Sequence, residues 1–195
     1  MLQVLGEGEN VTFIMAGIHG DEAAGTALVR QFRDYLDRHR NLLEGKKVVL
    51  LPLANPDGKA GQIRQNARGV DLNRNFPSAN RVVSPESGRS ALSEPETWVV
   101  YKIIREYRPA RIISVHQPLG CVDYDGPAED IARRMAEACG LPQKRLGARP
   151  GSLGSYSSQV RRIPIVTLEL LDSDSDLSAE QLWTRYGKAL LAASQ

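Results

Sequence analysis

Short apolar stretches that alternate with helical patterns constrain the fold of this chain most strongly. Four β-rich runs bounded by glycine, proline or polar residues predict buried strands at residues 11–16, 47–53, 111–115 and 163–171. Between and after these runs, apolar residues at helical spacing predict helices within residues 21–45, 93–109, 127–140 and 178–190. This alternation is typical of an α/β domain, here with a mixed, mostly parallel sheet flanked by helices.

Length and composition fit one soluble domain spanning residues 1–195. Hydrophobic residues make up 42% of the chain, and the net charge is only +2, with basic residues spread along the sequence. No nucleic-acid partner is therefore expected. No apolar stretch has the length of a leader or a membrane span, which predicts a cytoplasmic protein with no membrane partner. Two cysteines, Cys121 and Cys139, are too few for a disulfide framework and are expected to be reduced thiols.

Helix ends are predicted from capping residues. Asp21 is expected to cap the first helix, which Gly45 would end. Ser93 with Glu96, and Ser178 with Gln181, have the spacing of capping boxes. Residues 54–92 show little periodicity, and a loop of that length in a compact domain is usually functional.

Polar side chains follow the ends of all four predicted strands. His19 and Asn55 come after the first two strands, His116 follows the third, and Glu169 lies near the end of the fourth. Ligands of open α/β sheets bind outside the carboxyl ends of the strands. Residues scattered over the sequence should therefore meet at one edge of one sheet.

Three of these residues form a candidate catalytic zinc site. Such sites use three protein ligands and leave one position for water, and His19, Glu22 and His116 supply that set. The alternative is that both histidines are ordinary hydrogen-bonded residues at strand ends. The pair together with Glu22 favours one zinc ion per chain. His39, in a charged stretch, is expected to be solvated on a helix face.

Glu169 is the candidate general base. It lies in the apolar run Ile165–Leu171, where an ionisable group is costly unless it is paired or faces a site. The alternative is an edge-strand glutamate that points into water. Its place beside the predicted metal edge favours a base that acts on water at the zinc.

Two arginines are candidates for binding a carboxylate or a developing oxyanion. Arg74 stands between Asn73 and Asn75, whereas Arg64 has a nearby rival in Arg68. Guanidinium groups suit both tasks because they donate in a fork, although most arginines are surface residues. The turn Asn55-Pro56-Asp57-Gly58 is expected to shape this loop rather than to react.

Together, these motifs resemble the carboxypeptidase A-like zinc peptidases, in the order that this family uses. The matching pieces are His19-x-x-Glu22, Asn55–Gly58, Gly69–Phe76, His116 and Thr167-x-Glu169, which cover nearly the whole chain. The resemblance implies a zinc carboxypeptidase-like fold, with zinc bound by His19, Glu22 and His116. It also implies that Glu169 is the base, that Arg64 polarises the scissile carbonyl, and that Asn73 and Arg74 bind the terminal carboxylate of a small peptide.

A narrower resemblance is to the bacterial murein peptide amidase A group, through the stretches 116–127 and 150–156. It implies cleavage between γ-D-glutamate and meso-diaminopimelate in a cell-wall tripeptide, in the cytoplasm, during peptidoglycan recycling. Tyr124 and Asp125, soon after His116, would then reach the pocket rim, with Asp125 accepting from the far amino group of diaminopimelate. Equally, Tyr124 could pack on a neighbouring helix and Asp125 could cap the helix at Pro127.

Two other functions are compatible with parts of this pattern. Deacylases of N-acyl amino acids, of the succinylglutamate desuccinylase and aspartoacylase type, share the zinc and arginine motifs. The Asn55–Gly58 turn and the Asn75-Phe76-Pro77 ending favour the peptidase branch. A non-enzymatic binding module would need a missing ligand or base, and none is missing.

Overall fold

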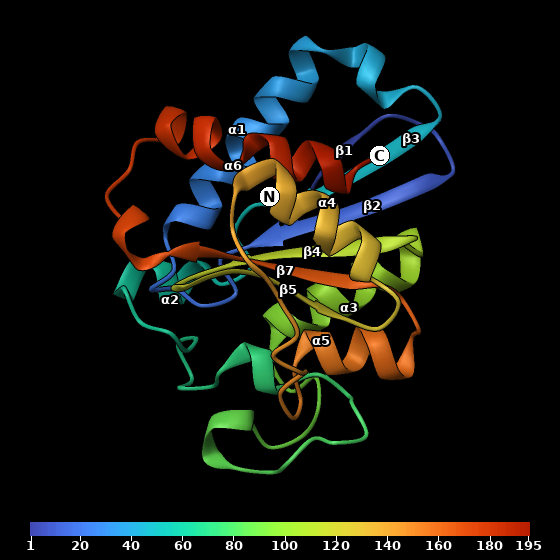
Figure 1. The fold of residues 1–195 in the computed structure, drawn as a ribbon. Coiled ribbons are helices and arrows are strands. Elements are labelled where there is room, and N and C mark those ends of the chain that lie inside the picture. Colours follow the sequence, from blue (N-terminus) through green and yellow to red (C-terminus); the bar gives the residue numbers. More distant parts are fainter.

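The computed structural model describes residues 1–195 and is built on one mixed sheet of seven strands (Figure 1). Their spatial order is β1-β3-β2-β4-β7-β5-β6. The strands are β1 (Gln3–Leu5), β2 (Asn10–Ala16), β3 (Lys46–Leu51), β4 (Arg111–His116), β5 (Leu119–Asp125), β6 (Gln143–Lys144) and β7 (Ile165–Leu171). The four predicted strands correspond to β2, β3, β4 and β7, which lie side by side and parallel at the centre.

The remaining strands make the sheet mixed. β1 pairs antiparallel with β3, β5 pairs antiparallel with β7, and the short β6 runs parallel to β5. The sequence pattern did not predict β5, because only two residues separate it from β4 and it carries polar side chains toward one face. Because β5 pairs with one edge of β7 and β4 pairs with the other, β7 is an interior strand.

Three helices cover one face of the sheet, namely α1 (Ala24–Arg38), α4 (Glu129–Cys139) and α6 (Ala179–Ala193), as Figure 1 shows. Their apolar stripes meet alternate residues of the central strands in a core of 26 buried residues. Leu28, Met135 and Tyr186 are examples from the three helices. Burial of this stripe is the main reason why each helix is stable in water.

The opposite face is covered by α3 (Pro95–Tyr107) and by two irregular segments, one before α3 and one between β6 and β7. These segments contain α2 (Pro56–Gly61), α5 (Leu153–Ser155), a π-helix at Tyr156–Val160, and short 3-10 helices at Leu72–Arg74 and Pro85–Ser87. Phe76, Ile104 and Tyr156 belong to a second core of 16 buried residues beneath them. The long loop predicted at 54–92 is thus anchored over the sheet.

Two of the three predicted helix caps are wrong. Asp21 does not cap α1, because the helix begins later and the backbone N–H of Ala24 donates to Gln117 Oε1 instead. Ser93 does not cap α3 either, since its hydroxyl donates to the carboxylate of Glu94, which occupies the cap position. The capping box of Ser178 and Gln181 at α6 is confirmed. The first helix also ends at Arg38, before a 3-10 turn at Arg40–Leu43, rather than at Gly45.

The chain direction creates a crevice at the carboxyl end of the sheet. From β2 the chain crosses to β3 on one side, and it later returns to β4 on the other side of β2. Such a reversal of strand order is where open α/β sheets bind ligands. None of the helices combines the length and the apolar character needed to cross a membrane.

Candidate active site

The polar residues predicted at strand ends do meet at one edge of the sheet. His19 follows β2, His116 is the last residue of β4, and Glu169 is its direct register partner on β7. The predicted convergence is therefore confirmed. It arises because neighbouring parallel strands end at the same level, so that residues distant in sequence become neighbours.

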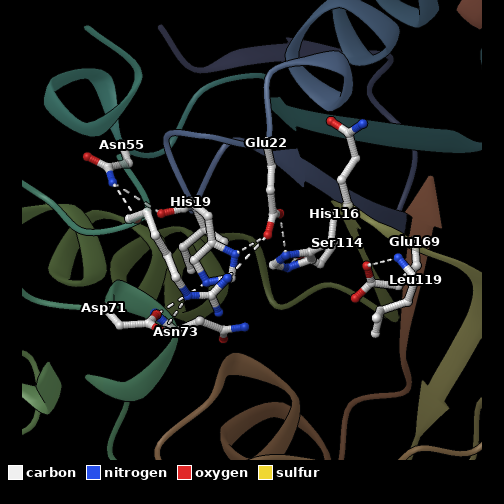
Figure 2. A network of polar contacts seen from close by, with 12 residues as sticks. His19, Glu22, Asn55, Asp71, Asn73, Ser114, His116, Leu119 and Glu169 are labelled. Carbon is white, nitrogen blue, oxygen red and sulfur yellow. Dashed lines mark hydrogen bonds and ion pairs between the residues drawn. The ribbon is translucent and has the colours of Figure 1, made fainter. Parts of the chain in front are cut away.

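The carboxylate of Glu22 lies between the two histidine rings, as Figure 2 shows. Glu22 Oε1 is 2.6 Å from His19 Nδ1, and Oε2 is 2.9 Å from His116 Nδ1. All three side chains are buried, and their ligand atoms lie within 4.8 Å of one another. Two imidazole nitrogens and a carboxylate oxygen are a donor set that suits zinc, so these residues fit the ion that the sequence predicts.

A second layer of hydrogen bonds fixes the orientation of both rings. His19 Nε2 is 3.2 Å from Asp71 Oδ1, and His116 Nε2 is 2.9 Å from the hydroxyl of Ser114. Both rings thus use Nε2 for support and turn Nδ1 toward Glu22. Such outer contacts set the tautomer and direction of metal-binding histidines.

The charges in this cluster stabilise one another. Burial acts to raise the pKa of Glu22, but His116 and His19 outweigh it and bring that pKa to about 2. Burial is likewise opposed at Asp71, where His19 and two arginines hold the pKa below its usual range. At His19, burial acts to lower the pKa, yet hydrogen bonds to Asp71 and Glu22 leave it raised. The two carboxylates are therefore ionised at neutral pH.

Glu169 lies beside this cluster on an interior strand, so the reading as an edge-strand residue facing water does not hold. Thr167, Glu169 and Leu171 are half-buried on one face of β7, while their neighbours point into the core. Burial raises the pKa of Glu169, although the charge of His116 opposes the shift. Its Oε2 is 3.5 Å from the backbone N–H of Leu119. A half-buried carboxylate with few fixed partners is free to exchange a proton with a ligand.

Arg64, rather than its rival Arg68, reaches the cluster. Arg64 Nε donates to Asp71 Oδ2 at 3.0 Å, and its Nη1 is 3.5 Å from Glu22 Oε1. Arg68 instead lies 3.8 Å from Glu94, away from the metal donors. The guanidinium of Arg64 therefore borders the space in front of the three donors.

The turn at Asn55 holds the segment that carries Arg64. Asn55 Nδ2 lies within hydrogen-bond distance of the backbone carbonyls of Arg64 and Gln65, while its Oδ1 accepts from Gly58 N–H. Gly20 must lack a side chain here, because a Cβ would stand 1.9 Å from the Gly58 carbonyl carbon. The expectation that this turn shapes the loop is confirmed.

Asn73 and Arg74 line the same pocket, on the segment that follows Asp71. Asn73 Oδ1 accepts from Leu153 N–H at 2.9 Å, and Arg74 Nη1 donates to the carbonyl of Asn73 at 2.7 Å. A Cβ on Gly151 would stand 2.3 Å from the Arg74 carbonyl oxygen. Close backbone packing thus ties the loop at 149–154 to the segment that presents Arg74.

The pocket in front of the donors has a volume of about 270 Å³. Its walls include the metal donors, Glu169, Arg64, Asn73, Arg74, Asp123, Asp125, Arg149, Ser152 and Thr167. Small-molecule sites have roughly 300–1,000 Å³, so this one suits a single amino-acid-sized group. A larger cleft of about 1020 Å³ over the 68–94 loop contains none of the metal donors.

Asp125 lines the pocket, but Tyr124 does not. The side chains of β5 alternate, so that Asp123 and Asp125 face the pocket while Tyr124 packs on the helix-covered core. The guanidinium of Arg145 lies over the Tyr124 ring, 5.7 Å from its centroid. Of the two alternatives for Tyr124, packing on the core is the one found, because a strand turns consecutive side chains to opposite faces.

No role was assigned from the sequence to three charged residues of the site, namely Asp71, Asp123 and Arg149. Asp71 could have been noticed, since it is a carboxylate between the apolar residues Val70 and Leu72 within the matched motif. Asp123 required knowledge that β5 is a strand. Arg149 gave no signal, because it is one of many arginines in an irregular stretch.

Comparison with known sequences identifies related proteins. The zinc carboxypeptidase family model matches residues 4–121, more than half of the chain. Murein peptide amidase A of Escherichia coli K12 is 34% identical, covering 86% of this chain and 74% of the relative. The protein of that name from Vibrio campbellii is 30% identical, covering 86% and 72%.

Solved structures share the fold. Murein-tripeptide amidase MpaA from Escherichia coli O157 superposes with a TM-score of 0.76 at 28% identity, covering 96% of this chain and 82% of that one. The crystal structure of thrombin activatable fibrinolysis inhibitor gives a TM-score of 0.83 at 20% identity, with coverages of 99% and 63%, and supports the fold alone.

These matches decide between the functional classes left open by the sequence. Neither the N-acyl amino acid deacylase nor the non-enzymatic binding module is favoured, since the matching family is one of peptidases and no donor or base is missing from the pocket. A zinc-dependent hydrolase of peptide or amide bonds is the activity that family and site have in common. The chain belongs to the zinc carboxypeptidase family.

Proposed function

We propose that this enzyme is a murein peptide amidase, which hydrolyses the amide bond between γ-D-glutamate and meso-diaminopimelate in a cell-wall tripeptide. The name of its relatives supports this substrate class. The observation that carries the proposal is one small pocket that combines three metal donors, a half-buried glutamate and charged groups of both signs. A short substrate with several charges fits such a wall better than a protein chain does.

His19, Glu22 and His116 would hold a single zinc ion per chain. When bound, the ion supplies a Lewis acid for the amide carbonyl and lowers the pKa of water to about 7. The buried, ionised carboxylate of Glu22 provides a compensating negative charge. Support of the two rings by Asp71 and Ser114 would keep their Nδ1 atoms aligned.

Glu169 would act as the general base and then as the general acid. It would accept the proton of the attacking water and pass it to the amine of the leaving diaminopimelate. A raised pKa suits both roles, because the carboxylate must take up a proton and also release it near neutral pH.

Arg64 would donate to the carbonyl oxygen as negative charge develops on it. Its ion pairs with Asp71 and Glu22 fix the guanidinium before substrate arrives, which limits reorganisation during the reaction. Loss of one such donor costs about 3–4 kcal/mol of transition-state stabilisation in comparable sites.

Asn73 and Arg74 would bind the carboxylate next to the new amine, and Asp125 would accept from the amino group at the far end of diaminopimelate. Arg74 forms no ion pair within the protein, so its charge is available to a ligand. Tyr124 has no part in this scheme because it lies behind the strand.

Product analysis tests the proposal. Purified protein with zinc should convert L-Ala-γ-D-Glu-meso-diaminopimelate into L-Ala-D-Glu and free diaminopimelate, seen by mass spectrometry. N-acetylaspartate and succinylglutamate should remain intact under the same conditions. Release of acetate or succinate without tripeptide cleavage would overturn the proposal in favour of a deacylase.

A place in cytoplasmic peptidoglycan recycling stays a prediction of this proposal. Cell fractionation with an antibody to the protein, together with the muropeptide pool of a deletion strain, tests it. Accumulation of intact tripeptide in the cytosol of that strain is the expected result.

A further inference from the structure

Two oppositely charged side chains on the pocket wall have no ionic partner in the protein. Asp125 and Arg149 both line the pocket, yet neither takes part in any of the ion pairs within the protein. The guanidinium of Arg149 also donates no hydrogen bond to the protein, although its carbonyl accepts from Ser155. Unlike Arg64, which is held by two carboxylates, Arg149 keeps all its donors available.

Backbone contacts bring Asp125 against the loop that carries Arg149, and both residues line the same pocket. The carboxylate of Asp125 lies against the backbone amide of Ala148, the residue directly before Arg149. On its other side, a Cβ on Gly154 would stand 2.6 Å from Asp125 Oδ2. The end of β5 and the loop at 146–154 therefore meet at Asp125, and Arg149 directly follows the contacting residue Ala148.

The loop that presents Arg149 is fixed at both ends. Leu146 N–H donates to Asp123 Oδ1 at 2.7 Å, and Leu153 N–H donates to Asn73 Oδ1 at 2.9 Å. Phe76 N–H also donates to the carbonyl of Gly151 at 2.9 Å. These bonds hold the loop against β5 on one side and against the segment of Arg74 on the other, so Arg149 emerges between them.

We propose that Arg149 and Asp125 form a two-point receptor for a zwitterionic group at the far end of the leaving residue's side chain. This inference rests on the proposed function and deepens it. Asp125 would accept from the ammonium, and Arg149 would donate to the carboxylate on the same carbon. Arg74 and Asn73 remain assigned to the other carboxylate, next to the scissile bond.

Charge matching supports this division of roles. meso-Diaminopimelate leaves with one carboxylate beside the reacting nitrogen and with an ammonium and a second carboxylate at its far end. The two carboxylates need two cationic groups, and Arg64 is already engaged by Asp71 and Glu22. Arg74 and Arg149 are the two remaining arginines of the pocket, and Asp125 supplies the anion.

The receptor gives a specific reason to reject a lysine peptide. Lysine presents the same ammonium without the far carboxylate, so it would engage Asp125 and leave Arg149 without its partner. α-Aminopimelate presents the carboxylate without the ammonium, and norleucine presents neither. The three analogues separate the two contacts, since each lacks one charge or both charges of diaminopimelate with little change in chain length.

The experiment measures kcat/KM for the four tripeptides with wild type, Arg149→Ala and Asp125→Asn. Arg149→Ala should lower the efficiency for diaminopimelate and α-aminopimelate by roughly 10- to 100-fold and leave the lysine and norleucine peptides unchanged. Asp125→Asn should have a similar effect on the diaminopimelate and lysine peptides only. A control is Arg68→Ala, which removes the same charge from the other cleft, near Glu94, and should leave every ratio unchanged.

The outcomes separate this inference from the proposed function. If wild type cleaves the diaminopimelate peptide and Arg149→Ala changes all four efficiencies equally, the receptor is wrong while the amidase stands. Equal loss in Arg68→Ala and Arg149→Ala would also overturn it, because a general charge effect would then explain both. If wild type cleaves none of the four, the proposed function fails and the receptor fails with it.

Discussion

The two ends of the pocket are built in contrasting ways. At the metal end, His19, Glu22, His116 and Asp71 are all buried, and nearly every polar atom is tied to another residue of the cluster. At the far end, Asp125 is half-buried, Arg149 is exposed, and neither has an ionic partner. Hydrogen bonds fix the side chains at the metal end. At the far end they fix only the backbone around Asp125 and Arg149.

This difference separates the task of reaction from the task of selection. Groups that act on a developing charge work best when their orientation is set in advance, since no reorganisation is then needed during the reaction. Groups that select a polar ligand must instead leave their hydrogen-bonding capacity open, so that a ligand without the matching group leaves them unpaired. Substitutions at the metal end should therefore affect all substrates, and those at the far end should change ratios between substrates.

The largest effect is expected from removal of a metal donor. His116→Ala should lose most of its bound zinc and nearly all turnover on every substrate, because Glu22 also loses a hydrogen-bonded partner. Metal analysis of the purified variant is the measurement. His39→Ala is the matched control. His39 is an exposed residue at the C-terminal end of α1, so this variant should keep its zinc. Full zinc occupancy in His116→Ala would remove this residue from the site.

Glu169→Gln should abolish turnover while the zinc content and the fold are retained. General acid–base groups contribute about 10²- to 10⁴-fold to rates, and the amide cannot take up the proton. Steady-state kcat on all four peptides, with metal analysis alongside, measures the effect. Turnover close to that of wild type would mean that another group accepts the proton.

Arg74→Ala should weaken only substrates with a free carboxylate beside the scissile bond. Loss of one partner of a buried charge pair costs about 2–5 kcal/mol, and an amidated substrate should lose much less. Arg68→Ala is a suitable control, because Arg68 lies near Glu94 in the other cleft. Equal losses for the free and the amidated substrate would assign Arg74 to structure or to the oxyanion.

Acid should weaken the preference of the pocket for a substrate with an ammonium group at its far end. Burial and the neighbouring charge of Asp123 raise the pKa of Asp125 to about 6, so its carboxylate is neutral below that pH and charged above it. The efficiency ratio of the diaminopimelate to the α-aminopimelate peptide should therefore fall as pH drops through about 6.

Taking a ratio cancels titrations that both peptides share, including that of Glu169. The other charged groups near Asp125 are Asp123, Arg145 and Arg149, which act on both substrates alike. Asp125→Asn should give a flat ratio over the same pH range. A ratio that still falls in this variant would contradict the assignment to Asp125.

The smallest effect is expected from Gly154→Ala. The added Cβ would stand 2.6 Å from Asp125 Oδ2, and the carboxylate can move away because it ends a flexible side chain. Stability should change little, while the ratio of the diaminopimelate to the α-aminopimelate peptide should fall modestly. Thermal unfolding and the two efficiencies measure this. Unchanged selectivity would mean that the exact position of Asp125 is unimportant.

The sequence by itself determined the central architecture and the chemistry of the metal end. Apolar runs of strand length between helical patterns predicted β2, β3, β4 and β7, because burial on both faces of a parallel sheet leaves a continuous apolar signal. His19, His116 and Glu169 could then be placed together, since the ends of parallel strands are level. The donor types and their spacing were enough to predict zinc.

Only the tertiary structure decided the far end of the pocket. β5 has mixed polarity and pairs with β7, which comes after a helix and a loop later in the chain, so no local pattern shows that Asp125 faces the pocket and Tyr124 the core. Arg149 and Asp71 reach the site through backbone contacts between irregular segments. Such contacts depend on long-range packing rather than on periodicity, which is why the metal end could be predicted from sequence, whereas at the selective end Asp125 was only one of two open alternatives and Arg149 was missed.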